Sequence, residues 1–297
     1  MQPDELARLA ARVVPGGGPA TIDCLSCGLV NSSYRVGRAG RQYVLRVASA
    51  SAGSSSLELG LDRAWEMRVL QAASGAGLAP LVEYCDPPAG ILVVRWAMGR
   101  SWSPEEAQEP GNLQKIGALV RRIQALAAPA PARSMSPAAW VDFYRQALLR
   151  NPSRGRQAPR AAPAEALLAA LERFAAARPV LCHGDLHRLN LIDADGALLA
   201  LDWEYSHVSD PFWDLAGWSS NSDLGDEARH RLLYGYLQRA PLPADWSRLQ
   251  VLAALYDFLC LQWGQLYLNQ RPDGADPELL ERIERLAARL AASSVVE

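Results

Sequence analysis

Two short segments in the second half of the chain constrain it more than any other feature. The first is Leu181–Leu191, which reads LCHGDLHRLNL, and the second is Leu201–Tyr205, which reads LDWEY. They place Asp185 and Asn190 five residues apart, and Asp202 twelve residues after Asn190. An aspartate can accept a hydroxyl proton, and carboxylate and amide oxygens are ligands that suit Mg²⁺. The pattern therefore favours phosphoryl transfer to a hydroxyl group, with Asp185 as the base and the other two residues at the metal.

The spacing is similar to that of a kinase catalytic loop and its second metal-binding aspartate. However, HGD stands where protein kinases have HRD, and Asp-Trp-Glu stands where they have Asp-Phe-Gly. The blocks HGDLHRLNLI and LDWEYSHVSDPFWDLAGW instead resemble the aminoglycoside phosphotransferase and choline kinase superfamily, and are most similar to its bacterial choline kinase and thiamine kinase branch. The resemblance is strong from Val180 to Trp218 and weaker at the N-terminus. It implies ATP and Mg²⁺ as cofactors, with Glu204 assisting at the metal.

Some residues of these blocks are expected to be structural. Taken alone, Asp185 could cap a helix and Asp202 could end a hairpin, so only their shared order and spacing indicates a site. The resemblance implies that His183 braces the catalytic loop. It also implies structural roles for Asp210 and Asp214, one as a helix cap and the other as a brace for the catalytic loop.

The composition limits the class of protein. A chain of 297 residues with 49% hydrophobic residues can bury a sizeable core in one or two domains. The net charge of −2 gives no overall basic field, so we expect no nucleic-acid partner. The N-terminal MQPDELARLAARVV lacks the apolar core of a signal peptide, and no apolar run reaches 18 residues, so we expect no membrane association. Five cysteines, an odd number, fit a reduced cytoplasmic protein.

The scarcity of lysine excludes two enzyme classes. Lys115 is the only lysine, and it lies in NLQKIG, outside any glycine-rich loop. A P-loop NTPase needs a Gly-Lys-Ser/Thr sequence, and a pyridoxal enzyme would have to use Lys115 itself. Cys24 and Cys27 have the spacing of a metal or redox pair, but no second pair accompanies them, and we place them in the first strand and turn of a nucleotide-binding lobe.

The order of β-prone and helical segments predicts an α+β fold. A helix is expected at 4–14, strands at 20–26, 32–37, 42–47, 81–85 and 90–96, and a further helix at 57–73. Later helices are expected at 105–127, 137–149 and 163–177, and near 211–220, 226–239, 246–270 and 276–293. Small polar residues at 49–56, and Ala- and Pro-rich segments at 127–137 and 151–163, predict connectors. We expect a bilobal protein-kinase-like fold. A small N-lobe at 1–98, with five strands and one helix, would bind the nucleotide, and a larger, mainly helical C-lobe at 99–297 would carry the catalytic loop and substrate site.

The N-lobe contains candidate nucleotide contacts. The loop between the first two strands has the position of a phosphate-covering loop, with a glycine that lets the backbone turn and polar groups that can donate hydrogen bonds: Gly28, Asn31, Ser32 and Ser33. Arg46 stands where kinases have the lysine that holds the α- and β-phosphates, and its planar fork suits that contact. Glu66 would orient Arg46. Alternatively, Arg46 lies on an exposed edge strand and Glu66 is solvated.

The segment that follows the last strand of this lobe would meet the adenine. It reads VVRWAM over residues 93–98, so Trp96 and Met98 are the candidate adenine contacts. Gly99 follows directly and would let the chain turn between the lobes.

The substrate-side residues are inferred from the resemblance. The resemblance implies a cationic alcohol such as choline, ethanolamine or thiamine as the substrate, which aromatic faces and a carboxylate can bind. Tyr205 and Trp263 match aromatic positions of the choline kinase branch, and Tyr267 lies one helical turn after Trp263, where simple core packing is the alternative. Two positions depart from that branch: Cys260 replaces a tryptophan and Asn221 replaces an acid. Asp223 or Asp257 could supply the missing charge.

Two other functions stay open. A sugar or aminoglycoside kinase is the first, and the acids Asp223, Asp226 and Glu227 would suit a polyamine antibiotic. The second is a non-catalytic nucleotide-binding protein on the same fold, which the intact Asp185, Asn190 and Asp202 argue against.

Overall fold

The computed structural model describes residues 2–27, 31–48, 60–152, 164–194, 196–270 and 277–292. The chain divides into two compact units. The first consists of Met1–Trp102, Pro129–Pro131 and Leu189–Ser206, and the second of Ser103–Ala128, Ala132–Arg188 and His207–Glu297. The chain therefore passes from the second unit to the first directly after the HGDLHR sequence. The lobe boundary at residue 98 stays a prediction.

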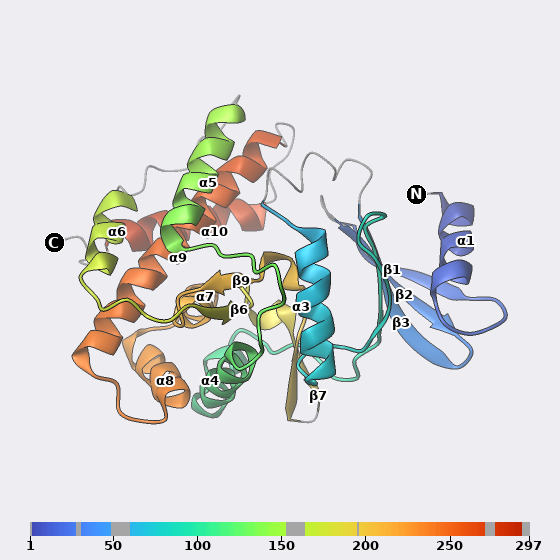
Figure 1. Cartoon of the computed structure of the whole chain (residues 1–297), viewed down its shortest axis with the longest axis horizontal. Helices are drawn as coiled ribbons and strands as arrows, with labels where there is room; N and C mark the ends of the chain where they lie inside the picture. The colour runs from blue at the N-terminus through green and yellow to red at the C-terminus, as the bar shows by residue number, and fades with distance from the viewer. Residues whose placement is uncertain are drawn as a thin grey trace. The chain divides into compact units, whose positions relative to one another are not determined.

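The first unit is built on a five-stranded sheet in the order β1-β2-β3-β5-β4, with each neighbouring pair antiparallel. The strands are β1 Thr21–Cys27, β2 Asn31–Arg38, β3 Arg41–Ala48, β4 Val82–Asp86 and β5 Ile91–Arg95. Helices α1 (Pro3–Val13) and α3 (Arg63–Gly75) lie on opposite sides of this sheet (Figure 1). The alternation of β3 explains the packing, because Tyr43 and Leu45 are buried in one cluster with residues of α1.

A hairpin of β7 (Leu191–Ala194) and β8 (Ala197–Ala200) also belongs to the first unit. The backbone N–H of Ala200 donates to the carbonyl of Leu78 at 2.7 Å, and the indole of Trp102 donates to Asp193 at 2.9 Å. Gly99 has a φ of +139°, and a Cβ at this position would lie 2.3 Å from the carbonyl oxygen of Asp193. The residue beside the hairpin must therefore be a glycine.

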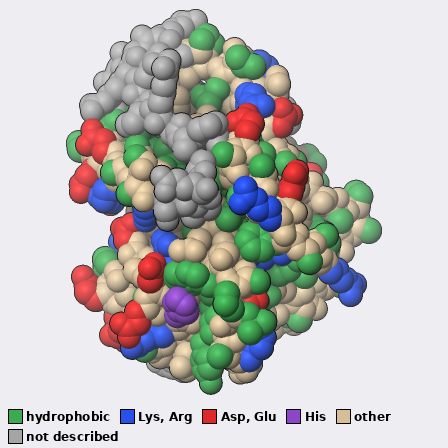
Figure 2. All heavy atoms as spheres, turned by 90° about the vertical axis from the view of Figure 1, so that its left-hand side faces the viewer, with side chains coloured by type: hydrophobic (Ala, Val, Ile, Leu, Met, Phe, Trp, Pro, Cys, Tyr) green, Lys and Arg blue, Asp and Glu red, His purple; other side chains and the backbone are tan. Residues whose placement is uncertain are grey.

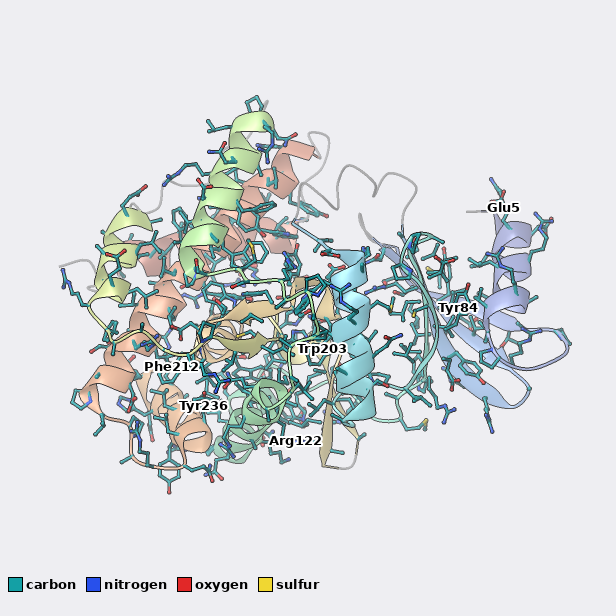
Figure 3. The ribbon with its side chains drawn as sticks, in the orientation of Figure 1. Glu5, Tyr84, Arg122, Trp203, Phe212 and Tyr236 are labelled. Atoms are coloured by element: carbon teal, nitrogen blue, oxygen red, sulfur yellow. The ribbon has the colours of Figure 1, made fainter. Side chains whose placement is uncertain are left out.

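The second unit is mainly helical. Strands β6 (Val180–Cys182) and β9 (His207–Ser209) pair, and the helices are α4 Pro110–Gln124, α5 Pro137–Arg150, α6 Ala164–Glu172, α7 Trp213–Asn221, α8 Asp226–Leu237, α9 Pro243–Gln270 and α10 Pro277–Ala291. The long α9 packs against α5, α6, α7 and α10. Phe212, just before α7, packs on Tyr236 of α8 with 5.7 Å between ring centroids (Figure 3). The core of this unit thus gathers around α9 and α7.

The expected combination of a five-stranded sheet unit and a larger helical unit is confirmed, although α1 packs on the sheet in addition to the expected helix. Three predicted helices are shorter than expected, and the one predicted at 163–177 ends at Glu172. Of the helix predicted at 57–73, residues 57–59 lie outside the described residues, and α3 begins at Arg63, where Asp62 accepts from the N–H of Trp65 at 2.9 Å. The helix predicted at 105–127 is a 3₁₀ turn followed by α4, because Glu109 is extended and Pro110 fits the first turn of a new helix. The connectors predicted at 49–56 and 151–163 lie mostly outside the described residues.

One face of the molecule shows how charge is distributed. Where the structure describes this face, arginine side chains are scattered among acidic and apolar ones and do not gather into one patch (Figure 2). Among the helices with described residues, none is both long enough and apolar enough to span a membrane.

Candidate active site

The HGD sequence forms a loop at the end of β6 that is held from within the second unit. The buried carboxylate of Asp214, in α7, accepts from the backbone N–H groups of His183 and Gly184, each at 2.9 Å. His183 is fully buried, and its Nδ1 accepts from the backbone N–H of Asp185 at 3.3 Å. Gly184 has a φ of +86°, which favours glycine. These contacts fix the backbone from His183 to Asp185.

Burial raises the pKa of Asp214 to about 6, and the nearby charge of Asp185 acts in the same direction. The backbone donors at His183 and Gly184 oppose this shift, because they stabilise the ionised carboxylate. Asp214 thus acts as an acceptor for the loop in a place where its charge is unfavourable.

Asp185 lies among groups that stabilise its charge. Its carboxylate is 3.5 Å from Nε2 of His187 and accepts from the hydroxyl of Tyr256 at 3.4 Å. Burial opposes ionisation of Asp185, but His187, His183 and Arg282 more than offset it and lower its pKa to about 2. The carboxylate is therefore ionised at neutral pH, as a group that accepts a proton must be.

Asp210 does not cap α7, contrary to one of the two roles expected for the pair of structural aspartates. The N-cap position is Phe212, which makes no side-chain cap. The carboxylate of Asp210 instead accepts from the backbone N–H of Phe212 at 2.9 Å and pairs with Arg248 of α9. It therefore fixes the turn before α7 and ties that turn to α9.

In the first unit, Arg46 of β3 joins two acids. Its guanidinium is 2.5 Å from Glu66 of α3 and 3.2 Å from Asp202. Glu66 is 1% exposed and Arg46 is 13% exposed, so Arg46 is not an exposed edge-strand residue and Glu66 is not solvated. Burial lowers the pKa of Arg46, but Glu66, Asp202 and Glu204 outweigh it and raise the pKa above its ordinary value.

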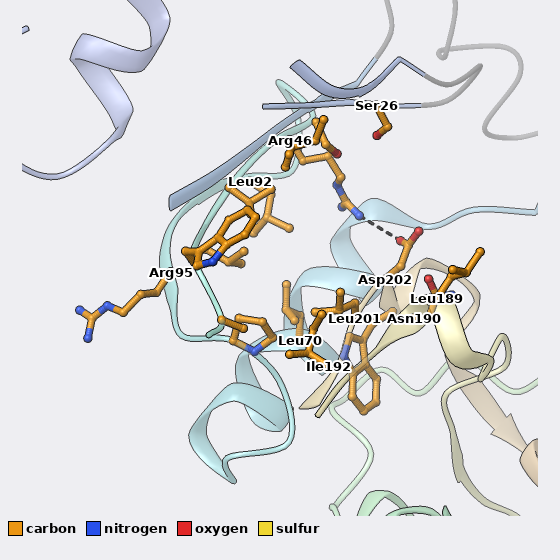
Figure 4. A pocket seen from close by; sticks show the side chains of 18 of the residues that line it. Ser26, Arg46, Leu70, Leu92, Arg95, Leu189, Asn190, Ile192, Leu201 and Asp202 are labelled. Atoms are coloured by element: carbon orange, nitrogen blue, oxygen red, sulfur yellow. Dashed lines mark hydrogen bonds and ion pairs between the residues drawn. The ribbon is translucent and has the colours of Figure 1, made fainter. Parts of the chain in front are cut away.

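These side chains line a cavity of about 460 Å³ in the first unit (Figure 4). Ser33, Arg46, Glu66, Asn190 and Asp202 supply polar groups. Much of the remaining wall is apolar: Leu25, Val44, Leu70, Pro80, Leu92, Val94, Trp96, Ala97, Ile192, Leu201 and Trp203. An apolar cavity with a few polar groups at one part of its wall suits a flat heterocycle joined to a charged group.

Most of the predicted nucleotide contacts can be located. Ser33, Arg46, Glu66 and Trp96 line the cavity. Of the other predicted contacts, Ser32 lies in β2, and the side chain of Asn31 hydrogen-bonds to Glu204 and Arg63. Met98 is 77% exposed and does not line this cavity. Gly28 lies outside the described residues. The neighbours Ala97 and Gly99 do line it, so the chain after β5 reaches the cavity without the Met98 side chain.

The predicted metal ligands meet in one region of the first unit. Asn190 and Asp202 line the same cavity, and the carbonyl of Asn190 accepts from the backbone N–H of Leu201 at 2.9 Å. Asp202 adopts a left-handed conformation with a φ of 57°, which aspartate tolerates better than most residues. An amide oxygen and a carboxylate are hard donors, so Asn190 and Asp202 fit Mg²⁺. Among the described residues, no group of three or more His, Cys, Asp and Glu forms a candidate metal cluster.

Glu204 has different partners from those expected of a metal ligand. Its carboxylate accepts from the amide of Asn31 at 3.0 Å and pairs with Arg63 at 3.0 Å. Arg63 also donates to Asn31 at 2.7 Å and pairs with Glu66 at 2.8 Å. Burial raises the pKa of Glu204, although Arg63 and Arg46 oppose the shift. Glu204 thus closes a polar network that connects β2 and α3, and its role at the metal stays a prediction.

The predicted substrate residues fall in different units. Tyr205 lies in the 3₁₀ turn Trp203–Tyr205 of the first unit, and Trp263 and Tyr267 lie on α9 of the second. The Trp263 and Tyr267 rings stack with centroids 5.2 Å apart and planes 30° apart. This pairing agrees with their helical spacing, and it is compatible with both packing and an aromatic face for a substrate.

Neither candidate for the missing acid is unpaired. Both oxygens of Asp257 accept from Arg289 at 2.7 Å, and Asp223 pairs with the same arginine at 2.7 Å. The expected position itself, Asn221, accepts from Arg282 at 2.5 Å. The sequence alone gives no reason to choose these arginines, because α10 reads as an ordinary amphipathic helix.

Residues 25–252 match the model of the Phosphotransferase enzyme family. The chain belongs to this family. Over 55 residues it is 40% identical to the protein LicA of Haemophilus influenzae, and this match covers 18% of the chain and 21% of LicA. The chain thus matches about a fifth of that relative's length.

Two solved structures show the same fold over nearly the whole length of this member of the phosphotransferase family. The choline/ethanolamine kinase family protein from Mesorhizobium loti has a TM-score of 0.76 and 25% identity, with 99% of this chain and 96% of that chain covered. The choline kinase LicA from Streptococcus pneumoniae has a TM-score of 0.74 and 20% identity, with 98% and 99% covered. The expected kinase-like fold and the resemblance to the choline kinase branch are confirmed.

Proposed function

We propose that this family member transfers the γ-phosphoryl group of ATP to a hydroxyl group of a small molecule. The observation that carries the proposal is the cavity of the first unit, where Arg46, Asn190 and Asp202 stand beside an apolar wall. Its volume and lining suit a nucleotide, with the adenine against apolar side chains and the phosphates near Arg46. When bound by Asn190 and Asp202, Mg²⁺ would neutralise charge on the transferring phosphoryl group.

Asp185 supplies the remaining chemistry. The substrate hydroxyl attacks the γ-phosphorus, the bond from that phosphorus to the β–γ bridging oxygen breaks, and ADP leaves. Asp185 orients the hydroxyl and takes its proton. The loop contacts from Asp214 and His183 hold the backbone of Asp185 in place, so the base does not have to be ordered during the reaction.

The predicted substrate is a cationic alcohol of the choline, ethanolamine or thiamine type. This prediction rests on Tyr205, Trp263 and Tyr267 as aromatic faces and on the choline and ethanolamine kinases among the similar structures. The acidic group proposed for a polyamine antibiotic has less support, because Asp223 pairs with Arg289 and Glu227 pairs with Arg231 at 2.5 Å. These acids are already neutralised by neighbouring cations.

The proposal is tested by ADP release across a panel of alcohols, with and without Mg²⁺. The panel contains choline, ethanolamine, thiamine, serine, neutral sugars and aminoglycosides. We expect ADP release that depends on both an alcohol and Mg²⁺, with the phosphorylated alcohol identified by mass spectrometry. ATP binding with no phosphorylated product from any alcohol would favour the non-catalytic alternative.

A further inference from the structure

Arg282 of α10 contacts Asn221, the position where a carboxylate was expected to hold a cationic substrate. Its guanidinium donates to the amide oxygen of Asn221 at 2.5 Å, and it also lies near the side chain of Cys260. These two partners are the positions at which the chain departs from the choline kinase branch. All three residues belong to the second unit. A neutral amide and a thiol replace the expected acid and tryptophan, and the cation of Arg282 lies beside them.

Hydrogen bonds connect Asn221 to the proposed base, Asp185. The amide of Asn221 donates to the hydroxyl of Tyr256 at 3.3 Å, and that hydroxyl donates to Asp185 at 3.4 Å. Arg282 is therefore connected to Asp185 through one amide and one phenol. A molecule whose hydroxyl lies at Asp185 needs only a short skeleton to bring a second group near Arg282.

Arg282 and Arg289, both on α10, differ in their partners. Arg289 pairs with Asp257 and Asp223 and is neutralised by them. In the part of the chain that the structure describes, no carboxylate forms an ion pair with Arg282. A guanidinium carries five N–H donors, and Asn221 and Cys260 offer only neutral acceptors. Arg282 is also exposed, so donors stay accessible to a ligand.

We propose that Arg282 binds an anionic group, a carboxylate or a phosphate, on the alcohol whose hydroxyl is phosphorylated at Asp185. Planar, paired oxygens are the acceptors that a guanidinium fork binds best. The preferred substrate is then a short hydroxy acid or hydroxyalkyl phosphate, with or without an ammonium group, in place of the purely cationic alcohol that the resemblance to the choline kinase branch predicts. The inference rests on the proposed function for the reaction, but the binding of the anion can be measured separately.

The experiment compares alcohols that differ in charge on similar skeletons. Serine is ethanolamine with an added carboxylate, and 3-hydroxypropanoate, 2-hydroxyethyl phosphate and choline complete the set. We expect wild-type protein to give a higher kcat/KM for serine or the other anions than for ethanolamine and choline. In Arg282→Gln, the KM for the anionic alcohols should rise tenfold or more, while the KM for ATP stays unchanged. The comparison of 3-hydroxypropanoate with 2-hydroxyethyl phosphate distinguishes a carboxylate from a phosphate.

Two further variants make the test specific. Arg285→Gln removes a charge from the same helix, where Arg285 pairs with Glu281 on the surface at 2.7 Å, and it should change no substrate constant. Asn221→Asp places a carboxylate beside Arg282 and restores the acid of the choline kinase branch. This variant should raise the KM for the anionic alcohols and lower the KM for choline. It also provides a second test if Arg282→Gln does not fold.

Binding without turnover separates this inference from the proposed function. Calorimetry with serine and 2-hydroxyethyl phosphate measures affinity directly. If no alcohol is phosphorylated, but these anions bind the wild type and not Arg282→Gln, the anion site stands and the phosphotransferase proposal fails. If choline or ethanolamine is the best substrate and neither variant changes its KM or that of the anions, the reaction stands and the anion site is wrong. Failure of all the anions to bind would also overturn the anion site.

Discussion

Asp185 is ionised because of its neighbours, and its charge state has a direct kinetic consequence. Its pKa is lowered to about 2, so lowering the pH from 7 to 4 should leave it ionised. An acidic limb of kcat/KM in this range must then come from another group, such as Asp214. The ionisation of Asp185 itself should affect kcat/KM only near pH 2, the lowest pH at which the protein could still be folded.

Substitution of Asp185 tests its role. Asp185→Asn should lower kcat by about 10² to 10⁴ and leave ATP affinity nearly unchanged, because the cavity of the first unit does not include this side chain. Steady-state kinetics and calorimetry with ATP measure the two effects. Wild-type turnover in this variant would show that another group takes the proton.

Asp214 should make stability depend on pH. Its folded-state pKa of about 6 lies above the ordinary value of 3.8, so the folded state holds the proton more tightly. The stabilisation from protonation is complete below pH 3.8 and is lost as the pH rises through 6. Relative to Asp214→Asn, which does not titrate, the free energy of unfolding of the wild type should fall by at most about 1.4 kcal/mol per pH unit over this interval. Urea unfolding at pH 4, 5, 6 and 7 measures the slope, and identical slopes for both proteins would contradict the shift.

At the scale of elements, the contact between Gly99 and the β7–β8 hairpin should be sensitive. Gly99→Ala combines a φ of +139° with a Cβ 2.3 Å from the carbonyl oxygen of Asp193, and the strained backbone alone costs about 1–3 kcal/mol. Gly111→Ala is the matched control, since nothing lies within 4 Å of its Cβ and alanine favours the helix. Thermal unfolding should show a lower Tm for Gly99→Ala and an equal or higher Tm for Gly111→Ala. Equal Tm values would mean that a side chain at position 99 does not clash with the hairpin.

The secondary structure was predictable wherever a pattern repeats. Tyr43 and Leu45 alternate with less buried neighbours, and this period identifies β3. The pairing of Arg46 with Glu66 was predicted from the kinase-like motif. The burial of this ion pair was not, because it depends on how α3 packs against the sheet. Arg282 and Tyr256 could not be predicted, because periodicity shows that a helix has an inner face without showing which neighbour each residue meets. The contacts of Asp210 could not be predicted for the same reason, since its partner Arg248 lies 38 residues away in the sequence.

At the scale of the molecule, the predicted roles divide between the units. The first holds the cavity with Arg46, Asn190 and Asp202, and the second holds Asp185 and Arg282. ATP with Mg²⁺ should therefore raise the Tm of both the wild type and Asp185→Asn, because a ligand at 100 times its Kd adds about 2.7 kcal/mol of stability. In Asp202→Asn the additional effect of Mg²⁺ should be lost. Equal Mg²⁺ dependence in all three proteins would remove Asp202 from the metal site.

The central claim is that this chain transfers the γ-phosphoryl group through Asp185, and single-turnover transfer from ATP labelled at the γ-phosphate tests it most directly. Excess enzyme is mixed with labelled ATP, Mg²⁺ and the best alcohol of the panel, and the label is followed into the alcohol. The account predicts complete transfer by the wild type, transfer slowed by at least about 10² in Asp185→Asn, and none without Mg²⁺. Label that appears only in inorganic phosphate, or that reaches the alcohol equally fast in Asp185→Asn, would contradict it.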